Sequence, residues 1–107
     1  MITRHSDHGY RRMADGVEMR NLVHGAGTMM VRFNLAAGSV LPLHSHPHEQ
    51  TGLLLSGRAH FTIAGDTTEV GPGDAWCVPG GIEHAFAALE DCVAIEVFSP
   101  LREEYLP

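Results

Sequence analysis

The sequence predicts an all-β fold, built as a sandwich or a barrel of short strands. Twelve glycines and six prolines interrupt a chain of only 107 residues, and both residue types break long helices. Between them lie short runs that favour strands, and the turn signals recur at the spacing typical of sandwiches and barrels. Hydrophobic residues make up 44% of the chain and charged residues 19%, which is the composition of a folded protein rather than a disordered one.

The first half of the chain is expected to supply three extended segments after a polar start. Residues 17–20 suit an edge strand, and residues 28–35 are rich in strand-favouring side chains and end at a turn containing Gly38. Residues 41–46 are expected to be extended, because Pro42 disfavours helix for the residue before it.

The second half is expected to consist of short strands that return on one another. Ser56-Gly57 is a tight-turn dipeptide, and the glycine permits the positive φ that a hairpin needs. The run 71–74 is a second strong turn. The expected strands cover residues 50–55, 59–63, 67–70, 75–78, 84–88 and 92–98. The tail 100–105 is expected to form one helical turn, too short to matter in the core.

Composition limits the classes of function. The formal net charge is −6, and without a basic patch to neutralise phosphates nucleic-acid binding is disfavoured. The first residues lack the apolar stretch of a signal peptide, and no run approaches the roughly 20 apolar residues that span a bilayer. A cytoplasmic protein without membrane partners is expected. In a reducing compartment Cys77 and Cys92 are expected to be small buried residues rather than a disulfide.

Histidine is over-represented, with eight in the chain. His44 and His46 are separated by one residue on an extended segment, so both rings face the same side. Gln50 keeps that parity if the strand is unbroken, and His84 lies some forty residues later. Neutral imidazole is a common transition-metal ligand. A lone histidine is usually an ordinary hydrogen-bonded residue, and the pair alone leaves both interpretations open.

The spacing around these histidines resembles the cupin signature. Gly38 is followed after five residues by His44-Ser45-His46, after three more by Gln50 and after six more by Gly57. A second block runs from Gly73 through Pro79-Gly80-Gly81 to His84. The resemblance implies one cupin domain over residues 1–107, a double-stranded β-helix or jelly-roll barrel, with motif one at 38–57 and motif two at 73–88. This chain departs from the family pattern at two positions. It has Gln50 where the family usually has glutamate, and Ala88 where the family usually has asparagine.

The remaining residues of these motifs have simpler interpretations. Core or interface positions are expected for Trp76, Val78, Leu53, Leu55, Phe61 and Ile63. His48 shares the parity of the pair but follows Pro47 in a turn. It is a pocket residue or a surface histidine, and the sequence leaves both open.

The last strand carries a carboxylate among apolar residues. Val93, Ile95 and Val97 share one face, and Glu96 and Phe98 share the other. If the valine face packs into the wall of the fold, Glu96 and Phe98 line the interior beside the metal. A solvent-facing position on an edge strand is the alternative, because an unpaired carboxylate is costly to bury.

Arg102 follows this strand after Pro100. Its planar fork suits a substrate carboxylate if the tail folds over the mouth of the barrel. The alternative is an ion pair with Glu103 or Glu104.

Residues 44–50 and 96–105 together resemble the KdgF-type cupins of pectin and alginate breakdown. Those proteins convert cyclic 4,5-unsaturated monouronates to the linear keto form. The resemblance implies a metal bound by His44, His46, Gln50 and His84, with Phe98 and Arg102 acting on the substrate. The family has an aspartate where this chain has Glu96, whose extra methylene moves the acid/base group by about a bond length.

The expected cofactor is one divalent transition metal, and nickel, zinc, iron and manganese all tolerate such ligands. Three imidazoles and an amide oxygen are neutral, so the ion keeps its full charge and acts as a strong Lewis acid. This favours isomerisation, hydration or plain ligand binding over oxidation. A non-catalytic cupin that binds a sugar or organic acid and a metal-dependent dioxygenase remain open. A carboxylated sugar is the expected ligand, and the edge before Leu35 is expected to form a homodimer.

Overall fold

The computed structural model describes all residues 1–107 and is built almost entirely of antiparallel strands. Glycine and proline keep the strands short, as Gly57 illustrates: its φ is +92°, and a Cβ there would lie 2.3 Å from the Asp91 carbonyl oxygen. The strands are β1 (Arg11–Ala14), β2 (Val17–His24), β3 (Met29–Leu35), β4 (Val40–His44), β5 (Glu49–Ser56), β6 (Ala59–Ile63), β7 (Asp66–Val70), β8 (Ala75–Val78), β9 (His84–Ala88) and β10 (Cys92–Ser99). A 3₁₀ turn, η1 (Glu103–Tyr105), follows β10.

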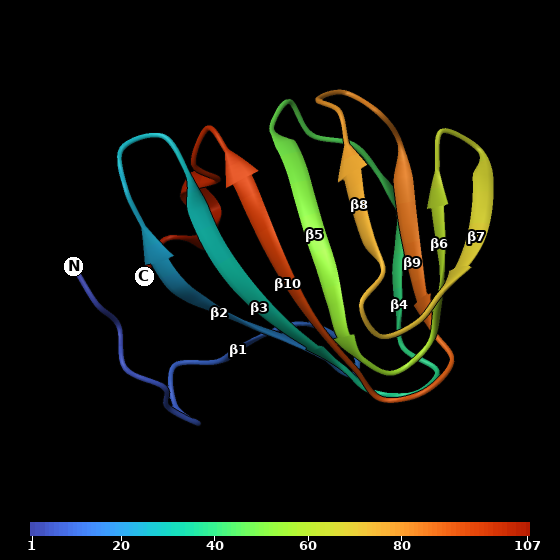
Figure 1. Cartoon of the computed structure of the whole chain (residues 1–107), viewed down its shortest axis with the longest axis horizontal. Helices are drawn as coiled ribbons and strands as arrows, with labels where there is room; N and C mark the ends of the chain where they lie inside the picture. The colour runs from blue at the N-terminus through green and yellow to red at the C-terminus, as the bar shows by residue number, and fades with distance from the viewer.

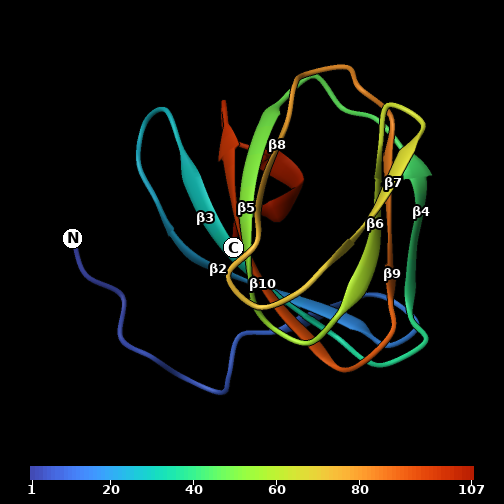
Figure 2. The same ribbon diagram turned by 45° about the vertical axis from the view of Figure 1, so that its right-hand side comes forward.

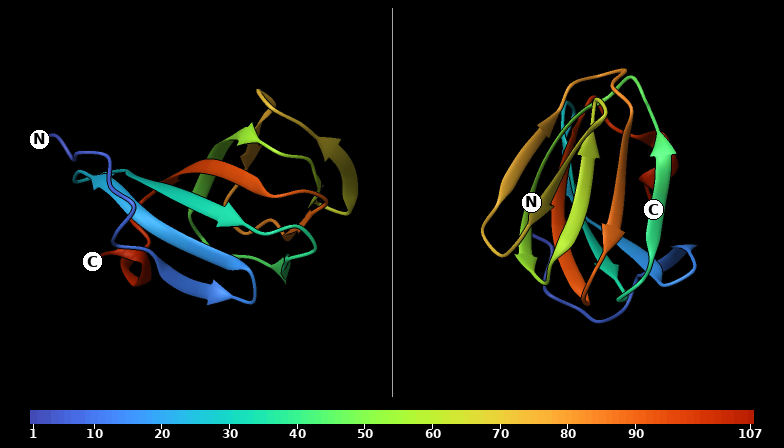
Figure 3. Two further views of the ribbon diagram at one scale, coloured as in Figure 1. Left: turned by 90° about the horizontal axis from the view of Figure 1, so that it is seen from below. Right: turned by 90° about the vertical axis from the view of Figure 1, so that its right-hand side faces the viewer.

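The strands form two sheets that face each other (Figure 1). The large sheet has the order β1-β2-β3-β10-β5-β8, and the small sheet has the order β4-β9-β6-β7. Seen from the side, the sheets curve toward one another like the walls of a barrel (Figure 3). The prediction of an all-β jelly-roll barrel is confirmed.

The core lies between the sheets because alternate side chains of each strand point inward. In β3, Met29, Val31, Phe33 and Leu35 are buried, whereas the residues between them are more exposed. In β10 the buried residues are Cys92, Ala94, Glu96 and Phe98. β10 lies between β3 and β5 in the middle of the large sheet. Glu96 is therefore an inward-facing residue of a central strand, and the alternative of a solvent-facing edge position is wrong.

The structure corrects several other expectations. β1 was not expected, and β2 is twice as long as the strand predicted there. Cys92 is buried and Cys77 is exposed, and both thiols are free, so the burial expected of Cys77 is wrong. Leu53 and Leu55 point outward on β5, which excludes the core position for them but not the interface position, and Leu54 is the buried residue between them. A run of three leucines gives no alternation from which to assign faces, whereas the sheet does.

The C-terminal tail contributes more than its length suggested. η1 is the single helical turn that was expected, but Tyr105 is buried in the core. Its ring packs edge-on against Phe33 and Phe98, with ring centroids 6.1 and 5.5 Å away. In Figure 2 the turn, in red, lies on the inner side of the large sheet. The expectation that the tail is irrelevant to the core is wrong, because one large aromatic residue can anchor a short segment.

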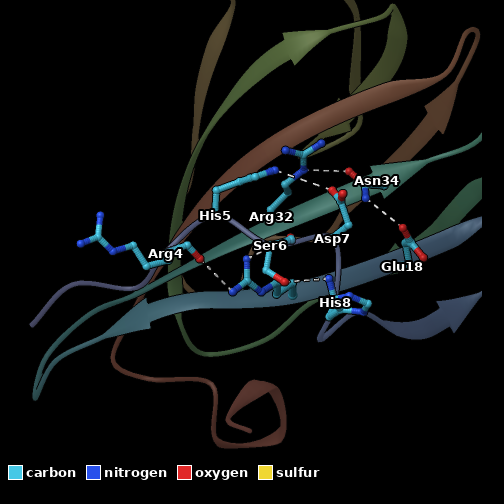
Figure 4. A network of polar contacts seen from close by, with 9 residues as sticks. Arg4, His5, Ser6, Asp7, His8, Glu18, Arg32 and Asn34 are labelled. Atoms are coloured by element: carbon cyan, nitrogen blue, oxygen red, sulfur yellow. Dashed lines mark hydrogen bonds and ion pairs between the residues drawn. The ribbon is translucent and has the colours of Figure 1, made fainter.

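The first ten residues cross the outer side of the large sheet (Figure 4). The Arg20 guanidinium donates hydrogen bonds to the backbone oxygens of Arg4 and Ser6, both at 3.3 Å. Beside it, the Asn34 amide accepts from Arg32 and donates to Glu18, each at 2.9 Å. These polar side chains lie on the outer face of β2 and β3, opposite the face that lines the barrel interior. Among the helices of the structure, none is long and apolar enough to cross a membrane.

Candidate metal centre and pocket

Three histidines converge at one end of the barrel. His44 ends β4 and lies directly across from His84 on β9, with ring centroids 4.2 Å apart. His46 reaches the pair from the loop after β4, with its ring 4.9 Å from that of His84. One ring nitrogen from each histidine lies within 4.8 Å of the other two. The three side chains are positioned to bind a metal ion.

Backbone carbonyls orient all three rings in the same way. The Nδ1 atoms of His44, His46 and His84 lie 2.8, 3.1 and 2.9 Å from the carbonyl oxygens of Pro42, His48 and Ile82. A carbonyl oxygen only accepts hydrogen bonds, so each Nδ1 donates and carries the ring proton. The Nε2 atoms are left as lone-pair donors, which is the arrangement that metal-binding histidines commonly have.

The local electrostatics keep two of these rings neutral. Burial, together with the positive charge of Arg102 and the neighbouring rings of His84 and His44, lowers the pKa of His46 to about 4, although its contact with Gln50 raises it. Burial also lowers the pKa of His84, against the opposing effect of its hydrogen bond to Ile82. Neutral imidazole is the form that binds metal, so protons compete weakly at these two positions.

Two further observations fit a divalent transition metal. His84 Nε2 is buried and has no hydrogen-bond partner, which is costly for a polar atom. His46 Nε2 lies 3.0 Å from the Gln50 side-chain oxygen, so a neutral ring and an amide oxygen turn lone pairs toward each other. Two ligands about 2.1 Å from a shared ion lie roughly 3.0–3.4 Å apart. A cation between these atoms would satisfy all of them.

Gln50 reaches this cluster by a different route from the one expected. β4 ends at His44, and Gln50 lies on β5 in the opposite sheet. The strand is therefore broken between them, and common parity does not explain why they meet. The chain crosses from the small sheet to the large sheet, and the facing of the sheets brings the residues together. His48 lies in this crossing, with its ring 5.5 Å from that of His46 and with a buried Nδ1 that has no partner.

A buried carboxyl group lies beside the histidines. Glu96 is only 5% exposed, and Trp76 Nε1 donates to both of its oxygens at 3.2 and 3.1 Å. Burial raises the pKa of Glu96 to about 8, although hydrogen bonds with Gln50 and Trp76 lower it. Without a bound cation, this carboxyl is therefore mostly protonated at neutral pH.

Arg102 lies at the same pocket and is held by the tail. Its Nε and Nη2 both bond to Glu104 Oε1, at 3.0 and 2.9 Å. The guanidinium stacks over the rings of Tyr105 and Phe98, with centroids 4.1 and 5.1 Å away. Arg102 thus pairs with Glu104, as one of the two alternatives predicted, and it also lines the cavity.

One pocket joins these groups. Its lining comes from both sheets and the tail and is largely apolar: Phe33, Leu35, Leu41, His44, Gln50, Phe61, His84, Phe86, Ala94, Glu96, Phe98, Arg102 and Tyr105. Predicted residues from distant parts of the sequence therefore share one cavity. Its polar groups include the Glu96 carboxyl, the Arg102 guanidinium and the rings of His44 and His84.

The Cupin domain family model matches residues 31–98, more than half of the chain. This chain belongs to the cupin family. The structure of KdgF from Halomonas sp. has a TM-score of 0.93 to this cupin and is 28% identical, covering 99% of this chain and 98% of that one. An RmlC-like cupin from Shewanella frigidimarina also has a TM-score of 0.93 at 22% identity, over 98% and 95% of the two chains, which supports the fold alone.

A curated relative extends the likeness in sequence. The oxalate decarboxylase OxdC of Bacillus subtilis is 31% identical over 88 residues, which are 78% of this cupin and 22% of that protein. This cupin therefore spans about a fifth of the length of that relative. The similarity therefore concerns only the aligned fifth of OxdC.

Sequence reasoning missed two residues next to the site in this cupin. Trp76 was assigned to the core, and it does pack there, but its indole N–H also binds Glu96. Gly52 lies between them on β5 and was not singled out. A glycine inside a strand often marks the close approach of another group, and that signal was present in the sequence.

Proposed function

We propose that this cupin is a metal-dependent enzyme that converts cyclic 4,5-unsaturated monouronates to the linear keto form. The observation that carries the proposal is the shared pocket, which is lined by histidines of the cluster, Glu96, Phe98 and Arg102. The similarity to KdgF over nearly the whole of both chains supports the same assignment. The substrate class comes from the sequence resemblance to KdgF-type cupins.

His44, His46, Gln50 and His84 would hold the metal ion. The three imidazoles have free Nε2 lone pairs, and the Gln50 oxygen adjoins one of them. A divalent ion in this uncharged donor set supplies a Lewis acid that polarises oxygen atoms of the sugar. The remaining chemistry belongs to the side chains around it.

The reaction is an isomerisation that moves protons. Ring opening breaks the bond between the ring oxygen and the anomeric carbon, and the proton of the anomeric hydroxyl moves to the former ring oxygen. The resulting enol then loses this proton and gains one on the neighbouring alkene carbon. Atoms balance without an oxidant, so the site needs a group that holds and transfers a proton.

Glu96 is the group that supplies this proton transfer. Its carboxyl lines the pocket, and in the metal-free protein burial raises its pKa to about 8. A carboxyl group whose pKa is near the working pH is an effective general acid and base, typically contributing about 10²–10⁴ in rate. Glutamate in place of the family's aspartate keeps this chemistry and shifts its position.

Arg102 and Phe98 bind the substrate in this proposal. Arg102 Nε and Nη2 are held by Glu104, so Nη1 is left to meet a uronate carboxylate. The aromatic stack beneath the guanidinium fixes its plane. Phe98 is almost fully buried at the pocket wall, where its ring offers an apolar surface to the sugar.

The test is an assay on unsaturated galacturonate and its epimer. Metal-loaded protein is expected to speed the loss of the alkene's ultraviolet absorbance, with the keto product identified by NMR. Glu96→Gln is expected to lower kcat by about 100-fold or more, whereas Glu90→Gln, in an exposed turn, serves as the matched control. No acceleration by wild-type protein with any of nickel, zinc, iron or manganese would reject the proposal.

The same assay separates the other candidates. The 31% sequence identity to an oxalate decarboxylase makes oxalate a second substrate to test, with release of carbon dioxide as the readout. Unchanged uronate together with thermal stabilisation would favour a binding protein. Oxygen consumption with ferrous iron would favour a dioxygenase.

The proposal includes a homodimer formed through the edge before Leu35. Met30, on β3 in this edge, supports an association of this kind, because its apolar side chain is 39% exposed. Light scattering is expected to give about twice the chain mass of 11.6 kDa. A mass near that of one chain would reject the dimer.

A further inference from the structure

Three neighbouring strands place a tryptophan, a glycine and a glutamate in one row. β8, β5 and β10 are adjacent in the large sheet. Gly52 on β5 pairs with Trp76 on β8 and with Glu96 on β10. Directly paired residues on adjacent strands project to the same side of a sheet. The side chains of Trp76 and Glu96 therefore both point into the barrel, and Gly52 between them has no side chain to separate them.

The contact between the two flanking residues crosses over the glycine. Trp76 Nε1 lies 3.2 and 3.1 Å from the two Glu96 oxygens. A Cβ built on Gly52 would lie 2.1 Å from Glu96 Oε2 and 2.3 Å from Trp76 Nε1. Even alanine would therefore overlap both partners. Gly52 has ordinary negative φ, so glycine is needed there for space and not for backbone conformation.

The indole is itself held from the opposite sheet. Phe61 on β6 packs edge-on against Trp76 with ring centroids 4.9 Å apart, and Phe86 on β9 lies 6.3 Å away. Trp76 is buried, so its N–H has no water to exchange for the carboxyl. Glu96 lines the pocket, whereas neither Trp76 nor Gly52 does. The hydrogen-bonded contact of Trp76 with the pocket lining is the one to Glu96.

We propose that Gly52 and Trp76 are positioning residues for Glu96. Gly52 has no side chain, so the Glu96 carboxyl can reach Trp76 across β5, and the indole N–H then holds the carboxyl in place. The arrangement suits glutamate rather than aspartate. A shorter side chain at position 96 would withdraw the carboxyl from the indole by about 1.5 Å, the length of one carbon–carbon bond. The catalytic meaning of the placement rests on the proposed function, but the placement itself does not.

The placement can be tested without substrate. The chain contains one tryptophan, so its ¹H–¹⁵N spectrum has a single indole N–H resonance. In the wild type this resonance is expected to exchange slowly with solvent. Glu96→Asp is expected to shift it and speed its exchange, whereas Glu90→Asp in an exposed turn leaves it unchanged. An indole resonance that Glu96→Asp does not move would overturn the proposal.

The effect on catalysis is tested by Trp76→Phe, which keeps an aromatic ring and removes the N–H. A positioning role predicts a fall in kcat of about tenfold with KM and metal content unchanged. Loss of thermal stability with kcat unchanged would mean that Trp76 is only a core residue. If wild-type protein has no ring-opening activity, the NMR result still decides the placement, so the two failures are distinguishable.

Gly52→Ala provides an independent check. It is expected to perturb the indole resonance and to lower kcat at least as much as Trp76→Phe. The matched control is Gly25→Ala, because a Cβ at Gly25 meets no atom within 4 Å. A Gly52→Ala protein with the wild-type indole resonance and kcat would contradict the proposal. If this variant does not fold, Trp76→Phe and Glu96→Asp carry the test.

Discussion

The two halves of the pocket are organised in different ways. In the histidine half, each ring is oriented by a backbone carbonyl close to it in sequence, such as Pro42 for His44 and Ile82 for His84. In the carboxyl half, Glu96 is oriented by Trp76, 20 residues away on a different strand, across Gly52. One half relies on local backbone and the other on tertiary packing.

The two halves also keep their titratable side chains uncharged in different ways. Short local contacts present lone pairs in the histidine half, where burial keeps His46 and His84 neutral. Apolar and aromatic packing buries the carboxyl of Glu96, and this burial raises its pKa to about 8. The two halves line one cavity, and burial in each favours the uncharged form of its titratable side chains.

The largest expected effect concerns the histidine half. His84→Ala removes a buried lone-pair donor and is expected to weaken metal binding by more than about 100-fold. Calorimetric titration and metal analysis of the purified protein measure this loss. His60→Ala, on the exposed face of β6, is the control and is expected to bind normally. Equal metal content in both variants would show that the cluster is not the metal site.

The next effect is a pH dependence of stability that belongs to Glu96. Its folded-state pKa of about 8 lies above the ordinary value of 4.5, so the folded state binds the proton more tightly than the unfolded chain. The stabilising contribution is complete below pH 4.5 and is lost as the pH rises through 8.

Glu96→Gln removes this dependence because its amide does not titrate. In metal-free protein the variant is expected to gain on the wild type as the pH rises, reaching on the order of a few kcal/mol above pH 8. Urea unfolding from pH 5 to 9 measures the difference. A constant difference across this range would mean that the carboxyl is not isolated from water.

A smaller effect is expected where the tail meets the carboxyl half. Arg102→Lys keeps the charge but loses the planar fork and the stack on Tyr105. KM for the uronate is expected to rise about tenfold while metal affinity stays the same. Arg12→Lys, on exposed β1, is the control. A change in kcat with KM constant would argue against a binding role for Arg102.

The smallest effect comes from placing a carboxylate, the side chain of the carboxyl half, in the histidine half. Gln50→Glu places a negative charge in the neutral donor set and is expected to tighten metal binding several-fold, since an anionic ligand attracts the cation more strongly. The same charge makes the ion a weaker Lewis acid, so kcat is expected to fall. Competition with a chelator measures the affinity. Weaker binding would indicate that Gln50 does not contact the metal.

The part of the histidine half that lies in one short stretch was easier to predict, because its information is local. The His44-Ser45-His46 pattern and the glycines around it lie within one short stretch, and most strands between the turns were predicted correctly. Faces were harder to assign. Leu53, Leu54 and Leu55 are chemically alike, so only the sheet decides that Leu54 is buried. Cys77 was misplaced for another reason: its burial was expected from the chemistry of free cysteines, whereas Trp76 and Val78 on either side of it are the buried residues.

The sequence by itself determined the all-β class, because turn chemistry and side-chain alternation act over a few residues, and its resemblance to cupins implied which residues would meet at the site. Only the tertiary structure decided that β10 is a central strand, that Tyr105 anchors the tail and that Trp76 meets Glu96 across Gly52. Strand order and register bring together residues far apart in the chain, and no local pattern encodes which strands become neighbours.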